Sequence, residues 1–282
     1  MSNNSFSGKI PQCLTGTRGP LAVLNLKRNN LTGIVSYTFA RKCSLQTLAL
    51  NKSQLEGKVP KSLANCRLLE VLDIGNNNMK DTFPCHLKNG SMLRVLILRF
   101  NRFHGPVGCL SSNATWSMLQ ILDLGSKNFG GKLPTNVFST WKAMMADELW
   151  IQSELNHLRF DDDFAALHYK DNFAALHYKD TIAITIKGLV VELVKILTVF
   201  TSLDLSCNNF KGPILGEIGE LKLPYILNMS HKSFTGRMPP SLRKLSHLES
   251  LDLSSNKLTG EIPVQLADDL TFLSVLNLSF NQ

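Results

Sequence analysis

The side chains best suited to chemistry lie in a segment that occurs twice in succession. FAALHYKD occupies residues 164–171 and again residues 173–180. Each copy contributes one histidine and one aspartate that could bind a metal ion: His168, Asp171, His177 and Asp180. The two histidines are nine residues apart, which turns a helix by about 180°, so they cannot share one helix face. We therefore favour a tandem duplication in a surface loop, where added length costs only ~0.6 kcal/mol per doubling, over a metal site.

A row of carboxylates is the second candidate for chemistry. The middle position of a Leu-x-Leu or Leu-x-Ile triplet is an aspartate at Asp73, Asp123, Asp204 and Asp252. If each triplet is one strand of a stack, Asp204 and Asp252 stand ~9–10 Å apart, which is wide for a retaining glycosidase. We expect these side chains to be ordinary solvent-facing surface residues. The sequence also lacks HExxH, GxSxG, phosphate-loop and kinase signatures, so we predict neither an enzyme nor a need for a cofactor or metal.

The triplets belong to a repeated unit that must position any functional side chain. The unit LxxLxLxxNxLxGxIP is clearest at Leu248–Pro263. Its asparagine position recurs at 4, 29, 53, 77, 101, 127, 208, 232, 256 and 281, in steps of 24 to 26 residues apart from one step of 81. Ten copies with so regular a period indicate a solenoid.

Each part of the unit has a physical explanation. The two leucines lie on one side of a short strand, and stacked coils bury them for roughly 1.5–3 kcal/mol each. The asparagine amide can satisfy loop backbone groups inside the coil. Three copies lack this residue. Ser53 keeps a hydroxyl, but Lys127 and Lys232 cannot accept a hydrogen bond and are costly to bury, so we expect loosened coils with both lysines turned outward.

These units resemble the extracellular leucine-rich repeats of plants. LDLSSNKLTGEIP, LRVLILRFNRFHGPV and SLDLSCNNFKGPI share with them the x-G-x-I-P half that follows the asparagine. The resemblance implies an α/β solenoid, a right-handed leucine-rich-repeat superhelix with a concave parallel β-sheet. We expect about six coils in residues 1–134 and about four, the last one truncated, in residues 199–282.

Residues 135–198 form an island insertion without the repeat. Apolar residues at helical spacing predict a helix over 136–152, and TIAITIKG predicts a strand over 181–188. Repeats, then an island with Tyr178, eight residues and Lys187-Gly188, then closing repeats resemble the kinase-lacking receptor-like proteins of plants. The resemblance implies that island and closing repeats meet a co-receptor, with these candidate residues: Tyr178, Lys187, Gly188, Ser206, Ser230, His231, Ser254 and Ser255.

Six cysteines form no CxxC pair, which disfavours a zinc ribbon or a thioredoxin-type site. Cys85 and Cys109 both fall eight residues after an asparagine position, so on neighbouring coils they could form a disulfide in an oxidising compartment. Cys43 and Cys66 fall ten and eleven residues before theirs, and for them we favour buried free thiols. Cys207 is expected on the concave face.

Seven N-x-S/T sequons exceed the roughly three that chance provides, which favours a secreted glycoprotein. The candidate glycosylation sites are Asn3, Asn30, Asn51, Asn89, Asn113, Asn228 and Asn277. We find neither a signal peptide nor a transmembrane helix, and both ends look cut.

Binding is the function that these observations leave, and solenoids bind through the rigid concave sheet. In the first half this face is expected to carry basic and amide side chains with one aromatic: Lys27, Arg28, Asn51, Lys52, Asn76, Arg94, Arg99 and Phe100. The net charge of +8 permits an acidic partner, but Lys and Arg are scattered, so we expect no nucleic-acid binding.

We therefore expect a ligand-recognising ectodomain fragment of a plant cell-surface receptor-like protein in defence or developmental signalling. Its ligand would be a peptide, a protein or a cell-wall-derived molecule, and its partner a membrane co-receptor kinase. The full-length protein would sit at the extracellular side of the plasma membrane. One alternative is a soluble apoplastic inhibitor of a secreted cell-wall-degrading enzyme, although the island argues against it. Another is a truncated, non-functional receptor copy, which the lost asparagines and the duplication favour.

Overall fold

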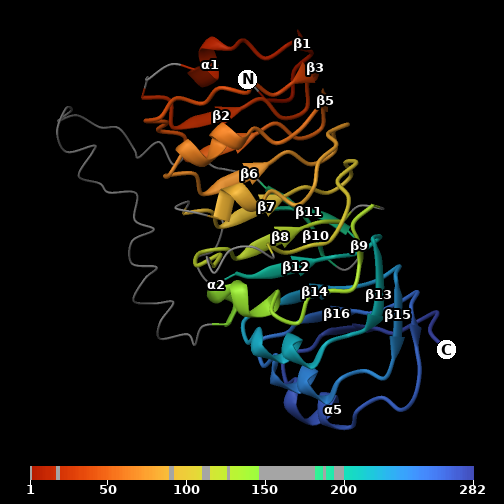
Figure 1. Ribbon diagram of the computed structural model, residues 1–282. Helices are drawn as coiled ribbons and strands as arrows, with labels where there is room; N and C mark the ends of the chain where they lie inside the picture. The colour runs from red at the N-terminus through yellow and green to blue at the C-terminus, as the bar shows by residue number, and fades with distance from the viewer. Residues whose placement is uncertain are drawn as a thin grey trace.

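The computed structural model describes residues 2–16, 20–88, 92–109, 115–125, 128–145 and 200–282, together with the backbone of two strands at 182–186 and 189–193. The described chain winds into a stack of coils whose two termini lie at opposite ends (Figure 1). This is the solenoid that the repeat predicts.

The main sheet is parallel, and among the described residues it has nine strands in the order β18-β16-β14-β12-β8-β7-β6-β4-β2. Successive coils pair in register, so Leu24 lies opposite Leu48 and Leu48 opposite Leu72. These leucines point into the stack and are at most 5% exposed, because alternate residues of a strand face opposite sides. The strands are β2 (Val23–Asn25), β4 (Thr47–Ala49), β6 (Val71–Asp73), β7 (Val95–Ile97), β8 (Ile121–Asp123), β12 (Ser202–Asp204), β14 (Ile226–Asn228), β16 (Ser250–Asp252) and β18 (Val275–Asn277).

The main sheet continues directly across the interruption of the repeat. Strand β8 pairs with β12, and Leu122 lies opposite Leu203 although they are far apart in sequence. The strand expected over 181–188 is present as β10 (Ile182–Ile186), which pairs antiparallel with β11 (Leu189–Leu193). The helix expected over 136–152 is described only as far as residue 145, and the rest of that range lies outside the described residues. The first part holds a 3-10 turn, η3 (Phe138–Thr140), and one helical turn, α2 (Lys142–Met145).

A second set of short parallel strands lies beside the first, toward the right in Figure 1. It forms two pieces, β1-β3-β5 and β17-β15-β13-β9, and between them the described residues contribute a single bridge, Gly105 to Phe129. The strands are β1 (Ser7–Gly8), β3 (Asn30–Ile34), β5 (Gln54–Glu56), β9 (Gly130–Gly131), β13 (Asn209–Pro213), β15 (Ser233–Gly236) and β17 (Lys257–Leu258).

Short helical turns complete most coils. They are α1 (Cys13–Gly16), η1 (Lys61–Asn65), η2 (Cys85–Lys88), η5 (Gly216–Glu220), η6 (Pro240–Lys244) and α5 (Gln265–Asp269). Leucines on these turns, such as Leu63 and Leu242, meet the strand leucines in one continuous core. Aromatic rings also stack from coil to coil, with ring centroids 6.1 Å apart for Phe103 and Phe129.

The asparagines form a hydrogen-bonded ladder inside the stack, as predicted. Asn101 donates its amide to the carbonyls of Leu98 and, one coil earlier, Ile74, at 3.1 and 2.9 Å. Its Oδ1 accepts the backbone N–H of Met79, also one coil earlier. Every such residue therefore joins two coils. The same side-chain roles occur at Asn29, Asn77, Asn208, Asn256 and Asn281.

Backbone geometry independently confirms the phase of the repeat. The residue directly before each described ladder position has a left-handed backbone, with φ between 50° and 59°, although none of these residues is glycine. Such a conformation is uncommon for side chains with a β-carbon, so its recurrence marks one fixed turn per coil. These residues are Asn3, Arg28, Lys52, Asn76, Phe100, Cys207, His231, Ser255 and Phe280.

The expectation that Lys232 turns outward is wrong. Its side chain lies inside the stack at the ladder position and is 7% exposed. The ammonium nitrogen lies 4.2 Å from the ring centroid of Phe210 and 5.4 Å from that of Phe234, so two aromatic faces replace the missing amide bonds. Strand β14 keeps its register with both neighbours, so this coil is not loosened. Lys127 lies outside the described residues.

Candidate binding surface

The aspartate row has a structural role. Asp73 and Asp123 are 2% exposed and Asp204 is 4% exposed, so the expectation that they face solvent is wrong. In each of the four coils that carry it, the aspartate Oδ1 accepts the backbone N–H two residues further on. This hydrogen bond fixes the turn before the left-handed residue. The acceptor and donor pairs include Asp73 with Gly75, Asp123 with Gly125, Asp204 with Ser206 and Asp252 with Ser254.

Burial raises the pKa of two of these carboxyls, Asp73 and Asp123. It raises the pKa of Asp73 to about 7, against the N–H of Gly75 and the positive charges of Lys27 and Arg99. Burial, helped by the negative charge of Asp204 on the adjacent strand, also raises the pKa of Asp123. The row is therefore a set of satisfied turn residues without the arrangement of a hydrolase.

Half of the predicted ligand-binding residues are buried. Arg99 pairs with Asp123 at 3.1 Å, and Arg94 lies 3.9 Å from Glu70. The exposed fractions of the buried four are 9% for Lys27, 5% for Asn51, 2% for Arg94 and 8% for Arg99. The remaining four are exposed or half-buried, and all have the left-handed backbone: Arg28, Lys52, Asn76 and Phe100.

We call the described left-handed residues on the coils between the first and the last the outer row: Arg28, Lys52, Asn76, Phe100, Cys207, His231 and Ser255. Each precedes an inward-pointing ladder residue, so its own side chain projects from the coil. Backbone hydrogen bonds align the row, for example from the N–H of Phe100 to the carbonyl of Gly125 on the next coil. Phe100 is 53% exposed and carries the Arg99 guanidinium 4.6 Å from its ring centroid.

The predicted co-receptor residues of the closing coils also divide into buried and accessible side chains. Ser206, Ser230 and Ser254 are buried, and Ser254 donates its hydroxyl to Asp252 at 2.7 Å. By contrast His231 is exposed and Ser255 half-buried, and both belong to the outer row. The predicted co-receptor residues Tyr178, Lys187 and Gly188 lie outside the described residues.

An apolar cluster that was not expected from the sequence lies on the sheet face opposite the leucines. Its members are Val71, Val95, Ile97, Ile121 and Ile226, none more than 4% exposed, with Phe200 and Tyr225 packed against them. The two aromatic rings are stacked, with centroids 5.7 Å apart. A β-branched residue directly before the first leucine of successive triplets was the available signal. This face is therefore buried along β6, β7 and β8, whereas the outer-row residues beside it are exposed or half-buried.

The structure contains two disulfides among the described residues, Cys43–Cys66 and Cys85–Cys109. The preference for free thiols at Cys43 and Cys66 is wrong, because their Cα atoms are only 4.6 Å apart despite the one-residue difference in phase. Cys13 and Cys207 are free.

The sequons differ in accessibility. Asn3 and Asn30 are exposed, and Asn228 and Asn277 are half-buried. Asn51 is 5% exposed, so a glycan there would require the side chain to leave its buried position. Asn89 and Asn113 lie outside the described residues.

Two further observations concern only the described part of the chain. No group of three or more His, Cys, Asp or Glu side chains could hold a metal ion there, and the duplicated His168 and His177 lie outside it. No described helix has the length and apolar character needed to cross a bilayer.

Comparisons with known proteins agree with this geometry. A leucine-rich-repeat family model matches residues 19–79, and a second one matches 200–221 and 247–268. Receptor-like protein 35 of Arabidopsis thaliana is 42% identical over 231 residues, which cover 79% of this chain and 22% of that protein. Receptor-like protein 54 of the same plant is 40% identical, covering 80% of this chain and 27% of its own length. The chain thus spans about a quarter of these relatives.

Solved structures show the same fold. The crystal structure of PEPR1-AtPEP1 covers 100% of this chain with a TM-score of 0.71 at 23% identity, over 31% of its own chain. A plant ice-binding protein covers 99% of this chain with a TM-score of 0.61 at 19% identity, over 71% of its own chain. The relationship supports the expectation that the chain is not an enzyme. The chain is a leucine-rich-repeat protein related to the receptor-like proteins of Arabidopsis.

Proposed function

We propose that the chain is the ligand-recognising part of a plant cell-surface receptor, and that the outer row supplies its ligand contacts. The observation that carries the proposal is the separation of roles along each coil. Buried asparagines and aspartates fix the backbone, while the left-handed residue between them projects outward. The row can therefore vary without disturbing the ladder.

The dimensions of the row fit an extended peptide. The eight coils from Arg28 to Ser255 cover about 34 Å at ~4.8 Å per coil. An extended peptide of about ten residues has the same length. Phe100 offers an exposed aromatic anchor, and Lys52 and Arg28 offer positive charge two and three coils earlier in the row. The match with PEPR1-AtPEP1 and the similarity to receptor-like proteins are in keeping with this role. We extend the proposal to a membrane co-receptor that meets the closing coils near His231 and Ser255.

A displayed library of peptides about ten residues long tests the proposal. Clones enriched on the full chain are compared on two triple variants. The row variant is Lys52→Ser, Phe100→Ser and His231→Ser. The matched control replaces similar exposed residues elsewhere: Lys257→Ser, Phe272→Ser and Arg237→Ser.

Clones that bind the wild-type chain and the control variant but not the row variant support the proposal. Clones that bind all three proteins equally place recognition elsewhere and refute it, as does a library from which no clone is enriched. Circular dichroism of each variant establishes that the coils are intact before binding is compared.

A further inference from the structure

One coil departs from the repeat, and a pocket lies at the departure. The fourth residue after a ladder position is a glycine with positive φ in most coils, including Gly57 and Gly105 with φ of 82° and 84°. In the coil of Asn77 the same position is Asp81. This coil contributes no strand to the second sheet, between β5 and the Gly105–Phe129 bridge, although backbone hydrogen bonds still join it to both neighbouring coils. A pocket of about 510 Å³ opens there, on a different side of the coils from the outer row, and this size is within the range of small-molecule sites.

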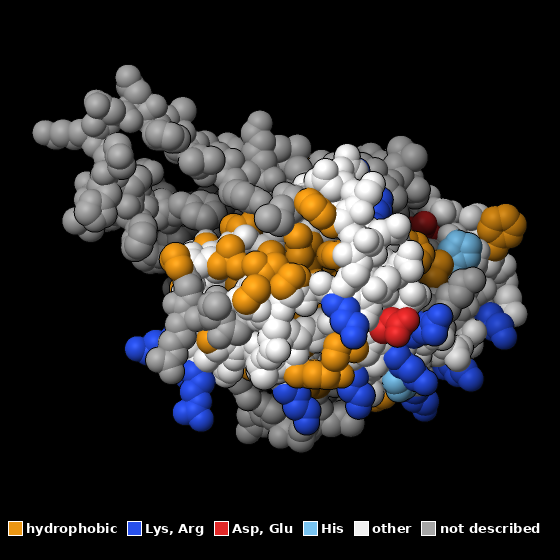
Figure 2. Space-filling view, turned by 90° about the horizontal axis from the view of Figure 1, so that it is seen from above, with side chains coloured by type: hydrophobic (Ala, Val, Ile, Leu, Met, Phe, Trp, Pro, Cys, Tyr) orange, Lys and Arg blue, Asp and Glu red, His pale blue; other side chains and the backbone are white. Residues whose placement is uncertain are grey.

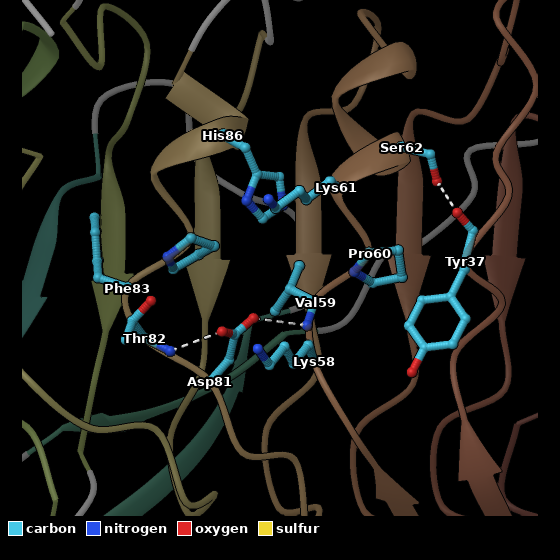
Figure 3. A pocket seen from close by; sticks show the side chains of 11 residues that line it. Tyr37, Lys58, Val59, Pro60, Lys61, Ser62, Asp81, Thr82, Phe83 and His86 are labelled. Atoms are coloured by element: carbon cyan, nitrogen blue, oxygen red, sulfur yellow. Dashed lines mark hydrogen bonds between the residues drawn. The ribbon is translucent and has the colours of Figure 1, made fainter. Parts of the chain in front are cut away.

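Asp81 holds the floor of the pocket together. Its Oδ2 accepts the N–H of Val59 at 3.0 Å, and its Oδ1 accepts the N–H of Thr82 at 2.9 Å (Figure 3). The backbone N–H groups of Val59 and Thr82 are therefore occupied and are not available to a ligand. The neighbouring Pro60 and Pro84 also line the pocket and have no N–H to offer.

The walls carry positive charge. Lys58 and Lys61 line the pocket from the preceding coil, and both are exposed. Neither forms an ion pair with Asp81 in the described structure. Lys80, on the coil of Asp81, is exposed as well. Seen from the N-terminal end, Lys and Arg side chains gather at the lower right, the side on which Figure 1 places β3 and β5 (Figure 2).

His86 lines the pocket with a neutral ring. Its Nε2 is closed to solvent and has no hydrogen-bond partner among the described residues. Burial lowers the pKa of His86 despite the nearby Asp81, which keeps the ring neutral. The ring therefore adds no charge that would oppose or replace that of the two lysines.

Tyr37 forms the opposite wall. Its ring is 57% exposed. Its backbone carbonyl accepts the hydroxyl of Ser62, and this hydrogen bond holds the Tyr37 backbone in place. Figure 3 shows the ring across the pocket from His86. A flat exposed ring of this kind can cover the C–H face of a sugar.

We propose that this pocket binds an acidic oligosaccharide of uronic acid type. Its carboxylates would meet Lys58 and Lys61, and a C–H face would lie on Tyr37. An acidic peptide shares the charge but presents no such C–H face, and at Val59, Pro60, Thr82 and Pro84 it would find no free backbone donor. The pocket is separate from the outer row, so a test of binding in the pocket can succeed or fail independently of the proposed receptor function.

Titration calorimetry of the full chain with a galacturonic acid trimer tests the inference. The fully methyl-esterified trimer is the uncharged comparison, and a short Asp-rich peptide is the competing class. Lys58→Gln and Lys61→Gln should each weaken trimer binding about tenfold, the effect of losing one charge-assisted hydrogen bond. Tyr37→Ala should weaken it as well, because it removes the ring that would cover the sugar face. Lys257→Gln, an exposed lysine of β17 in a regular coil, is the matched control and should leave binding unchanged.

The inference is overturned if the trimer does not saturate the chain, or if its methyl ester binds equally well. A peptide that binds more tightly than the trimer refutes the ligand class. Equal losses in Lys257→Gln and Lys61→Gln would mean general charge attraction without a site. Thermal unfolding of each variant guards against loss of fold, and Lys58→Gln, at an exposed residue, tests the pocket even if Tyr37→Ala disturbs the coil.

Discussion

Replacing Lys232 with asparagine should stabilise the closing coils, because it restores a ladder residue where a buried amine now stands. Among the described residues its Nζ has no hydrogen-bond partner. The neighbouring coil gives the expected geometry: Asn256 donates to Met229 and Leu253 and accepts from Phe234. By the same register, an asparagine at 232 would donate to the carbonyls of Leu205 and Met229 and accept the N–H of Phe210.

The net gain follows from opposing contributions. Three added hydrogen bonds contribute roughly 3 kcal/mol, and removal of the buried, unpaired amine contributes roughly 1–3 kcal/mol more. Loss of the alkyl stem against two aromatic rings costs roughly 2–3 kcal/mol, including the amine–ring contacts. We therefore expect Lys232→Asn to raise the free energy of unfolding by about 2 kcal/mol near pH 7 and the Tm by roughly 4 °C.

The gain should depend on pH with a defined sign. Burial lowers the pKa of Lys232 well below its usual value of 10.5. Between the two pKa values the unfolded chain binds a proton that the folded chain does not, so wild-type stability falls as pH falls toward the folded pKa. The advantage of asparagine is therefore larger at neutral pH than near pH 10, by up to ~1.4 kcal/mol per pH unit in this window.

Thermal unfolding followed by circular dichroism at neutral and alkaline pH measures both effects. Lys232→Met is the control, since it keeps the apolar stem and removes the amine without adding ladder bonds. It should flatten the pH dependence without the full gain in Tm. A Lys232→Asn protein that is no more stable than wild type, or whose advantage does not shrink as pH rises, would refute the buried-amine explanation.

Three further changes test other parts of the structure. Asp73→Asn keeps the acceptor for the Gly75 N–H but removes a carboxyl whose folded pKa of about 7 exceeds its usual 3.8. Wild-type stability should therefore fall as pH rises from about 4 through 7. Melting temperatures measured over this pH range should show that fall in the wild type and not in the variant. Asn101→Ala breaks contacts to two coils, so chemical denaturation should show a loss of roughly 3 kcal/mol, whereas Asn101→Ser should cost less. Replacing both Cys85 and Cys109 with serine opens a loop of 24 residues and should cost about 3.5 kcal/mol by chain entropy, measured against wild type with and without reductant.

The fold was predictable because its signal is repeated. A leucine pair and an asparagine every two dozen residues specify strand, core and ladder together, and one weak copy is corrected by its neighbours. Lys232 shows where this reasoning stops. From sequence, a lysine at a buried position implies an outward side chain, but the stacked Phe210 and Phe234 on adjacent coils offer it an aromatic environment. Only the three-dimensional stack shows that these rings meet the lysine.

The binding surface was predictable only in part, for a related reason. Periodicity separates core from surface, but it does not distinguish Arg99, which is buried against Asp123, from Phe100 beside it, which projects. That distinction depends on a left-handed turn and on what covers the sheet. The pocket was not predicted at all. Its residues come from three successive coils. Asp81 occupies a position that is glycine in the neighbouring coils, and this difference can be recognised only when the coils are aligned in the stack.

Both candidate sites follow from one property of the solenoid. A residue that supports the ladder is constrained by two coils, and a change there costs stability on both sides, as Asn101 illustrates. A residue of the outer row contributes its backbone N–H to the stack but leaves its side chain outside, so its chemistry can change independently. Asp81 uses a second route, because its carboxylate replaces a glycine turn with two hydrogen bonds of its own and leaves space beside it. Recognition in this chain should therefore lie where side chains are released from the ladder or where one coil departs from the repeat.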